Sequence, residues 1–201
     1  LTMTSATGYA LLENDAYGWY AGGTEMYDSY DFSTENTHTF RLSTADVVAG
    51  SRASVRVAMS ASDILSATNA SISLNNASLG QMTIPAYGDE EIARETRTYY
   101  TTKSLAAENS FTISTTQGHK ARLNYIEISY ERKLLASANP FAFIPHPTAA
   151  CVRLDIASAD ANTQLWRIGG RGRSIEKVSG SLSGTVFSAN IDDPQNRYVI
   201  V

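Results

Sequence analysis

Short runs in which apolar and polar residues alternate dominate the chain. This period of two, with β-branched and aromatic residues inside the runs and turn residues between them, predicts strands. The runs that we expect to be strands before residue 136 are 37–43, 53–61, 70–84, 94–104, 109–115 and 121–135. In 53–61, Val55 and Val57 share one face and Arg56 lies on the other. The polar run 94–104, rich in Thr and Tyr, is expected at a sheet edge.

The run 70–84 is expected to fold as a hairpin that turns at Asn75-Asn76. Asparagine tolerates the left-handed backbone conformation that a two-residue hairpin turn requires. The runs recur at the spacing of 8–12 residues that is typical of a β-sandwich. Short helical turns are expected only around 44–49 or 62–66.

The segment 121–135, ARLNYIEISYERKLL, changes its phase. Leu123 and Tyr125 place apolar residues at odd positions, and Ile126 and Ile128 then place them at even positions. A helical period also fits, but the β-branched and aromatic content favours a strand. We expect a β-bulge at the phase change, or a passage from burial on two faces to burial on one. The residues expected to face the core are Ile126, Ile128 and Tyr130.

A boundary is expected at 137–140, where Ser-Ala-Asn leads into a proline that cannot donate to a sheet. The strands expected after it are 141–144, 151–157, 163–169, 173–178, 184–189 and 197–201. The fold class predicted is all-β, with a jelly-roll-like β-sandwich over 1–136 and a smaller β-rich segment over 137–201. The last strand is expected to open a further domain.

Composition and charge argue against some classes of function and favour others. The 201 residues carry a net charge of −4, with a pI near 5.4, and this argues against nonspecific nucleic-acid binding, which needs clustered cations. No run of 18 apolar residues predicts a membrane span. The start, LTMTSATGY, has no charged or hydrophobic leader pattern. Charged residues are only 18% of the chain, and the many Ser, Thr and Asn residues suit a secreted or surface protein.

The single cysteine, Cys151, excludes an internal disulfide. Its apolar neighbours in AACVRLDI predict a small buried residue in a strand. A catalytic thiolate would need a nearby basic group, and no local pattern supplies one.

The segment 17–31, YGWYAGGTEMYDSYD, is the richest in aromatic residues. Rings that stack on sugars beside carboxylates that bond hydroxyls are typical of sugar-binding β-sandwiches. The candidate ligand-binding residues are Trp19, Tyr20, Tyr27, Asp28 and Tyr30. The alternative is that Trp19 and Tyr27 are core residues and that Gly22-Gly23 is a turn.

Metal and nucleotide sites are weakly indicated. The acidic residues Glu13, Asp15, Glu25, Asp28 and Asp31 match no calcium-loop spacing, and His38, His119 and His146 share no ligand spacing. The run 167–174, RIGGRGRS, is expected to be a hairpin turn with solvated arginines rather than a phosphate loop. Zinc-peptidase and serine-hydrolase motifs are absent, and no cofactor or metal is expected.

The stretch 124–134, NYIEISYERKL, resembles a segment of the PorU-type proteins, gingipain-like cysteine peptidases of the Bacteroidetes type IX secretion system. The matching residues are Asn124, Tyr125, Ile126, Ile128, Tyr130, Arg132 and Leu134. In that family a β-sandwich precedes the segment, and a β-rich stretch with a Trp, here Trp166, follows it. One departure is Trp166-Arg167-Ile168-Gly169, where family members often carry an acidic Trp-Asp motif, and this leaves room for a diverged relative.

The resemblance implies a cell-surface peptidase at the outer membrane whose catalytic His and Cys lie downstream of Val201. These 201 residues would then be a non-catalytic accessory region, with no catalytic residue of their own. The implied partners are the downstream catalytic domain and secreted cargo proteins. The alternative function is a carbohydrate-binding module, with glycans as partners.

Overall fold

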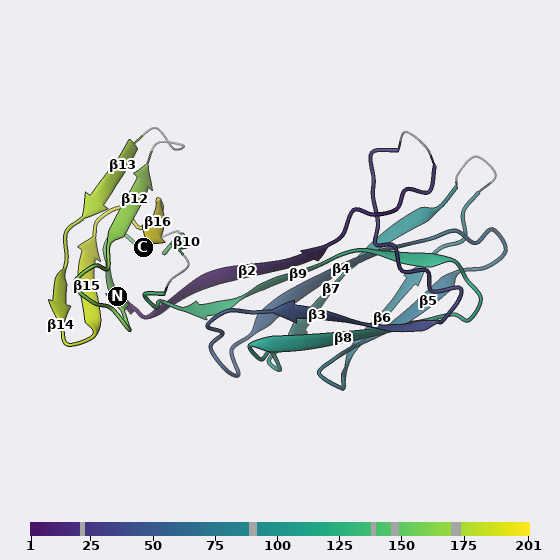
Figure 1. Ribbon diagram of the computed structural model, residues 1–201, viewed down its shortest axis with the longest axis horizontal. Coiled ribbons are helices and arrows are strands. Elements are labelled where there is room, and N and C mark those ends of the chain that lie inside the picture. Colours follow the sequence, from purple (N-terminus) through teal and green to yellow (C-terminus); the bar gives the residue numbers. More distant parts are fainter. Residues whose placement is uncertain (21–22, 89–91, 138–139, 146–148, 170–173) are drawn as a thin grey trace. The chain divides into compact units, whose positions relative to one another are not determined.

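The computed structural model describes residues 1–20, 23–88, 92–137, 140–145, 149–169 and 174–201. These residues form strands β1 to β16 and contain no helix, so the all-β prediction is confirmed (Figure 1). Among them, no helix qualifies as a membrane span. The expected helical turns at 44–49 and 62–66 are turns and bends without a helix.

Contacts divide the chain into two compact units that are not continuous in sequence. The first unit comprises Leu1–Gly8, Asp46–Val48 and Glu131–Val201, and the second comprises Tyr9–Ala45 and Ala49–Tyr130. Strands β2 and β9 therefore contribute residues to both units. The division into domains at residues 136 and 137 stays a prediction.

The second unit is a jelly roll built from two four-stranded sheets, in the orders β2-β9-β4-β7 and β3-β8-β5-β6. The strands of the first sheet are β2 (Ser5–Glu13), β9 (Ala121–Lys133), β4 (Ala53–Ala61) and β7 (Arg94–Thr102). The strands of the second sheet are β3 (Thr37–Ser43), β8 (Glu108–Thr115), β5 (Thr68–Leu74) and β6 (Ala77–Ile84). The jelly-roll prediction is confirmed, and β7 lies at a sheet edge as expected.

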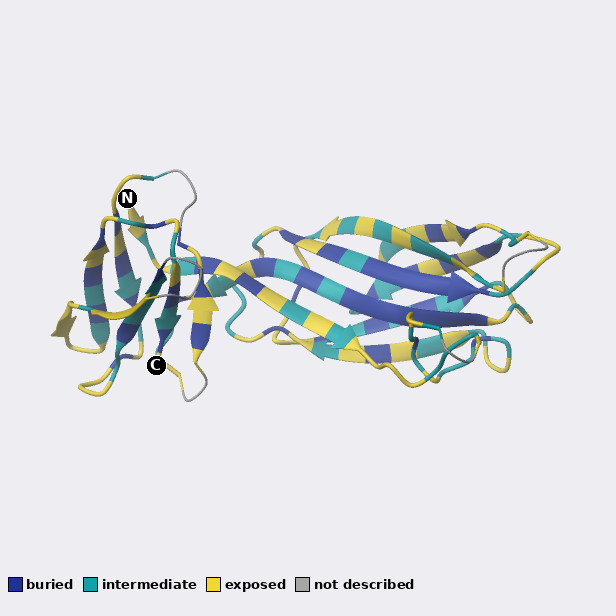
Figure 2. Ribbon diagram, turned by 90° about the horizontal axis from the view of Figure 1, so that it is seen from above, coloured by how far each residue is buried: buried dark blue, intermediate teal, exposed yellow. Residues whose placement is uncertain are grey.

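The core of the second unit lies between the two sheets. Val55, Val57, Phe111 and Ile113 are fully buried there. Figure 2 shows how buried and exposed residues alternate along the strands. This alternation is the period-two pattern of the sequence, because successive side chains of a strand point to opposite faces.

Strand β9 carries the phase change of the sequence as a β-bulge. Ala58 pairs with Tyr125 and Met59 pairs with Leu123, so Asn124 is the extra residue. Burial is continuous from Ala121 to Ile126 and alternates afterwards. The prediction of a bulged strand rather than a helix is confirmed, one residue before the expected position. Ile126, Ile128 and Tyr130 are buried, as expected.

The hairpin prediction is also confirmed. Asn75 and Asn76 connect β5 to β6 with φ angles of 50° and 67°. Two successive left-handed residues give the turn type that matches the right-handed twist of paired strands.

The first unit contains two further four-stranded sheets, in the orders β1-β11-β15-β14 and β10-β16-β12-β13. The strands of one sheet are β1 (Thr2–Met3), β11 (Val152–Ile156), β15 (Val186–Ile191) and β14 (Ser181–Ser183). The strands of the other are β10 (Phe141–Phe143), β16 (Arg197–Ile200), β12 (Leu165–Gly169) and β13 (Ser174–Val178). Their buried side chains, with Phe143, Leu154 and Tyr198 among them, form one core cluster.

Several details of the sequence interpretation were wrong or incomplete. Strands β1, β2 and β14 were not expected, because small and polar residues such as those of SATG weaken their pattern. Cys151 is exposed, because it precedes β11 and Val152 takes the inward position. The strand expected to open a further domain, β16, is an inner strand of its own sheet, between β10 and β12.

Candidate functional site

The aromatic segment 17–31 is tied to the sheet by a buried arginine of β9. Arg122 is only 7% exposed. Its Nη2 lies 3.0 Å from a carboxylate oxygen of Asp31, and its Nη1 donates to the carbonyl oxygens of Ser29, at 2.6 Å, and Asp28, at 3.3 Å. The guanidinium therefore satisfies backbone acceptors of the segment and pairs with its carboxylate at once.

Aromatic rings cover the same guanidinium. The Cζ atom of Arg122 lies 3.5 Å from the ring centroid of Tyr17 and 5.8 Å from that of Trp19. The two rings meet edge to face, with their centroids 5.3 Å apart. The indole Nε1 of Trp19 donates to Ser60 Oγ on β4 at 2.9 Å. These contacts fix the Trp19 ring against the sheet.

A pocket of about 420 Å³ opens beside this cluster. It is lined by Trp19, Tyr20, Gly23, Glu25, Tyr27, Ile92 and Ala93. Tyr20 is 58% exposed, whereas Tyr27 is buried. The pocket thus combines an exposed ring with the carboxylate of Glu25, which is the chemistry that holds a sugar by stacking and hydroxyl bonding.

The other two candidate residues have local roles. Asp28 accepts hydrogen bonds from Asn14 Nδ2 at 3.1 Å and from the backbone N–H of Tyr30 at 2.7 Å. The Tyr30 ring stacks on His38, with their centroids 3.9 Å apart, and its hydroxyl donates to the carbonyl of Glu35 at 3.0 Å. The structure therefore brings Trp19, Tyr20 and Tyr27 together at one pocket, with Asp28 and Tyr30 outside its lining. Ligand binding by any of the five stays a prediction.

Electrostatics at the segment follow from burial and from nearby charges. Burial, together with the charge of Glu95, raises the pKa of Tyr27 to about 12. Burial alone would raise the pKa of Asp31, but hydrogen bonds from Ser33 and the charge of Arg122 lower it below the usual 3.8. Asp31 is thus held as the anionic partner of Arg122.

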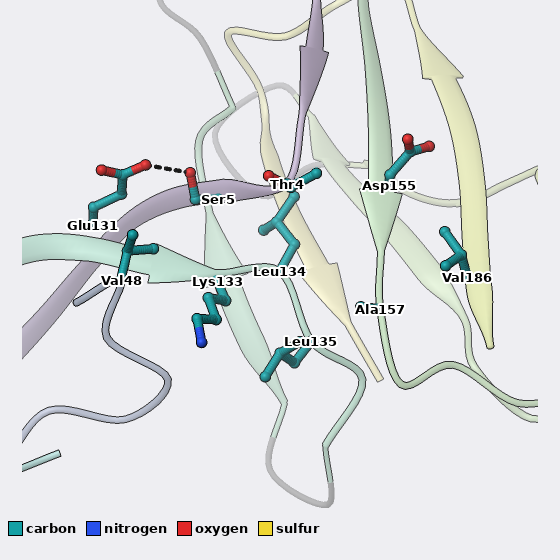
Figure 3. A pocket seen from close by; sticks show the side chains of 10 residues that line it. All are labelled: Thr4, Ser5, Val48, Glu131, Lys133, Leu134, Leu135, Asp155, Ala157 and Val186. Carbon is teal, nitrogen blue, oxygen red and sulfur yellow. Dashed lines mark hydrogen bonds between the residues drawn. The ribbon is translucent and has the colours of Figure 1, made fainter. Parts of the chain in front are cut away.

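The first unit has a cavity of its own, of about 470 Å³ (Figure 3). It is lined by Thr4, Ser5, Val48, Glu131, Lys133, Leu134, Leu135, Asp155, Ala157 and Val186. Its walls are largely aliphatic, and charged side chains of both signs lie among them. A cavity of this kind can receive an apolar side chain of a protein partner.

The two carboxylates that line this cavity, Glu131 and Asp155, accept hydrogen bonds from neighbouring side chains. Ser5 Oγ donates to Glu131 at 2.6 Å, as Figure 3 shows. Asp155 accepts hydrogen bonds from Arg153 Nε at 2.8 Å and from Ser188 Oγ at 2.7 Å. The hydrogen bond from Arg153, followed by that from Ser188, lowers the pKa of Asp155. Each carboxylate of the cavity is therefore already paired with a hydrogen-bond donor of the chain.

No group of three or more potential metal ligands occurs in the described part of the chain. His38 packs on Tyr30, and His119 Nδ1 lies 2.9 Å from Thr68 Oγ1. His146, the expected boundary residues 138–139 and residues 170–173 of the RIGGRGRS turn lie outside the described residues.

Fold and site together define a jelly-roll β-sandwich chain with an aromatic pocket. Its structure is similar to the crystal structure of dimeric latent PorU from Porphyromonas gingivalis, with a TM-score of 0.81 and 16% sequence identity. The match covers 100% of this chain and 20% of that one, so the chain spans about a fifth of its length. At this identity the likeness shows the fold.

Other solved structures are less similar. A family 35 carbohydrate-binding module from an environmental isolate matches with a TM-score of 0.39 and 16% identity, over 59% of this chain and 90% of that one. The C-terminal family 6 module of LamC from Zobellia galactanivorans matches with a TM-score of 0.35 and 12% identity, over 61% and 99% of the two chains. No protein-family model and no curated protein matches the sequence.

Sequence reasoning missed the residues that organise the aromatic segment. Arg122 and Ser60 are far from it in the sequence, and only the pairing of β9 with β4 places them under it. One available signal was the arginine of ARLNY, the one charged residue of that run. Ile92, which also lines the pocket, carries no such signal.

Proposed function

We propose that this chain is a non-catalytic region of a gingipain-like cysteine peptidase at the bacterial cell surface. The observation that carries the proposal is the likeness of the whole chain to part of PorU. The resemblance of residues 124–134 to the PorU-type segment supports it independently, because that resemblance lies in the residues rather than in the fold. The region then belongs to the protein-secretion machinery on the outer face of the outer membrane.

In this proposal the chain supports and docks a catalytic domain and contacts secreted cargo. The aliphatic cavity of the first unit suits such a contact, because apolar side chains that enter a pocket contribute strongly to protein association. Val186 and Leu135 lie in its wall and are the residues through which docking can be tested.

The proposal is tested on the full-length protein by peptidase assay with a thiol-directed inhibitor. Inhibition is expected, since the reaction class is that of a cysteine peptidase. Cys151→Ser is expected to leave activity unchanged, because Cys151 is an exposed residue outside the proposed catalytic domain. A full-length protein without peptidase activity, or activity lost in the Cys151 variant, contradicts the proposal.

A second candidate function is glycan binding at the aromatic pocket. It is favoured by the 58% exposure of Tyr20 beside Trp19 and Glu25. The test is a glycan-array measurement with the 201-residue chain and with Tyr20→Ala. Binding that disappears in the variant supports this function, and a chain that binds no glycan contradicts it.

A further inference from the structure

A second group of aromatic residues lies on the outer face of the sheet β2-β9-β4-β7. We define the tyrosine face as Tyr9 and Leu11 of β2, Tyr125 and Glu127 of β9, Arg56 of β4 and Tyr99 of β7. Arg56 pairs with Tyr99 on one side and with Glu127 on the other, so these three side chains form a row across the sheet.

The strand alternation explains why this face is the outer one. Val55 and Val57, on either side of Arg56, are fully buried in the core between the sheets. On β2, Tyr9 is 71% exposed and Leu11 is 55% exposed, whereas Ala10 between them is partly buried. Outward side chains of neighbouring strands share one surface.

Arg56 organises the middle of the tyrosine face. Its Cζ lies 5.0 Å from the ring centroid of Tyr125 and 5.9 Å from that of Tyr99. Its Nη2 donates to Glu127, and its Nη1 donates to the Tyr99 hydroxyl at 3.4 Å. The pKa of Arg56 is raised by the hydrogen bond to Tyr99 and also by that to Glu127. The rings and the charged groups thus hold one another in place.

Most of the charges on and beside this face are paired. Arg56 pairs with Glu127, and on β7 the Nε of Arg97 donates to Glu95 at 2.6 Å. Glu13, the next exposed position of β2 after Leu11, adds one negative charge. A polyanion therefore meets no net field of opposite sign, and a polycation meets only the one carboxylate of Glu13. An apolar protein surface would have to cover the Arg56–Glu127 pair, and taking such a pair out of water is costly.

We infer that the tyrosine face binds an uncharged, linear polysaccharide. Exposed rings such as Tyr99, 66% exposed, can stack on the C–H faces of sugars. Sugar hydroxyls can bond to the guanidinium and the carboxylate without stripping the ion pair of all its hydrogen bonds. From β2 to β7 the sheet crosses three strand spacings, about 14 Å, which favours a chain of sugars over a single ring.

This inference concerns a surface other than the aromatic pocket, and its test separates the two. The 201-residue chain is run in native gels that contain a soluble β-glucan, a mannan or a galactan, with alginate as the polyanion. At least one neutral polysaccharide is expected to retard the wild-type chain. The double variant Tyr9→Ala/Tyr99→Ala is expected to weaken that binding by about tenfold or more.

One control variant makes the result specific. Leu65→Ala removes a 91% exposed apolar side chain from a loop. It is expected to bind as the wild type does, and circular dichroism checks the fold of every variant. The inference is overturned if no neutral polysaccharide retards the wild type, if alginate alone does, or if the double variant binds as strongly as the wild type, because binding would then lie at another surface.

Discussion

The jelly roll presents two aromatic surfaces that are built differently. In the segment 17–31, rings pack on the buried Arg122 and only Tyr20 among the candidate residues is more than half exposed. On the tyrosine face, Tyr9 and Tyr99 stand out from regular strands and are mostly exposed. The density of aromatic residues in the sequence pointed to the first surface, yet the second carries two rings that are more than half exposed, Tyr9 and Tyr99.

The difference teaches that a cluster of aromatic residues in a loop needs its own core. A loop is not held by neighbouring strands. Rings, backbone carbonyls and a carboxylate of 17–31 therefore contact the guanidinium of Arg122, and these contacts hold the segment in place. A strand is already held by its neighbours, and its outward side chains remain available to a ligand. The free energy of unfolding should therefore depend mainly on the contacts of the segment 17–31, and ligand binding should depend mainly on the tyrosine face.

The largest expected effect is the loss of Arg122. Arg122→Ala leaves Asp31 without its partner and the carbonyl of Ser29 without its donor. The Arg122 side chain is 8% exposed and that of Asp31 29%, so the loss of unfolding free energy should approach the roughly 3–5 kcal/mol of a fully buried pair. Arg56→Ala is the matched control on the tyrosine face, where the ion pair is more exposed and a loss below about 1 kcal/mol is expected. Urea unfolding measures both. Equal losses would contradict the contrast between the surfaces.

The next effect concerns the indole hydrogen bond. Ser60→Ala removes the acceptor of Trp19 Nε1 and should cost about 1 kcal/mol. In a Trp166→Phe background, Trp19 is the remaining tryptophan, and its fluorescence should shift to the red as the ring gains water. An unchanged spectrum would show that the bond does not hold the ring.

A smaller effect is expected from acid. The pKa of Asp31 is lowered in the folded chain, so Asp31 contributes stability that is fully present above its unfolded pKa, about 3.8, and is lost as the pH falls through the folded value. The melting temperature of the wild type should therefore fall more steeply than that of Asp31→Asn at pH values below about 4. Parallel curves for the two proteins would contradict this role of Asp31.

The smallest effect on stability is expected on the tyrosine face. Tyr9→Ala and Tyr99→Ala remove mostly exposed rings, so each should change the unfolding free energy by no more than about 0.5 kcal/mol. Urea unfolding of the single variants checks this. A loss as large as that of Arg122→Ala would mean that these rings serve the fold rather than a ligand.

Much of the jelly roll could be predicted from alternation alone. Two examples are the valines Val55 and Val57, which share one face of β4, and the turn at Asn75-Asn76. Both features depend only on residues that are close in the sequence, so they can be predicted before the strand neighbours are known. The bulge of β9 was predictable because Leu123 and Ile126 are both apolar although they lie at positions of opposite parity, and the structure buries both.

The candidate sites were less predictable, because they depend on which strands become neighbours. The partners of Arg122 lie more than 90 residues away in the sequence. The tyrosine face consists of residues from β2, β9, β4 and β7, and no local sequence motif predicts that these strands are neighbours. The prediction that Cys151 is buried was wrong because β11 begins one residue later, at Val152. A shift of one residue at the start of a strand decides whether a side chain faces the core or the solvent.

The central claim is that these 201 residues are a non-catalytic region of a gingipain-like peptidase, and the most direct test is to read the gene beyond the codon of Val201. The account predicts a caspase-like peptidase domain in the same reading frame, with a histidine and a cysteine as its catalytic pair. A stop codon in that position, or a downstream domain of another class, would contradict it.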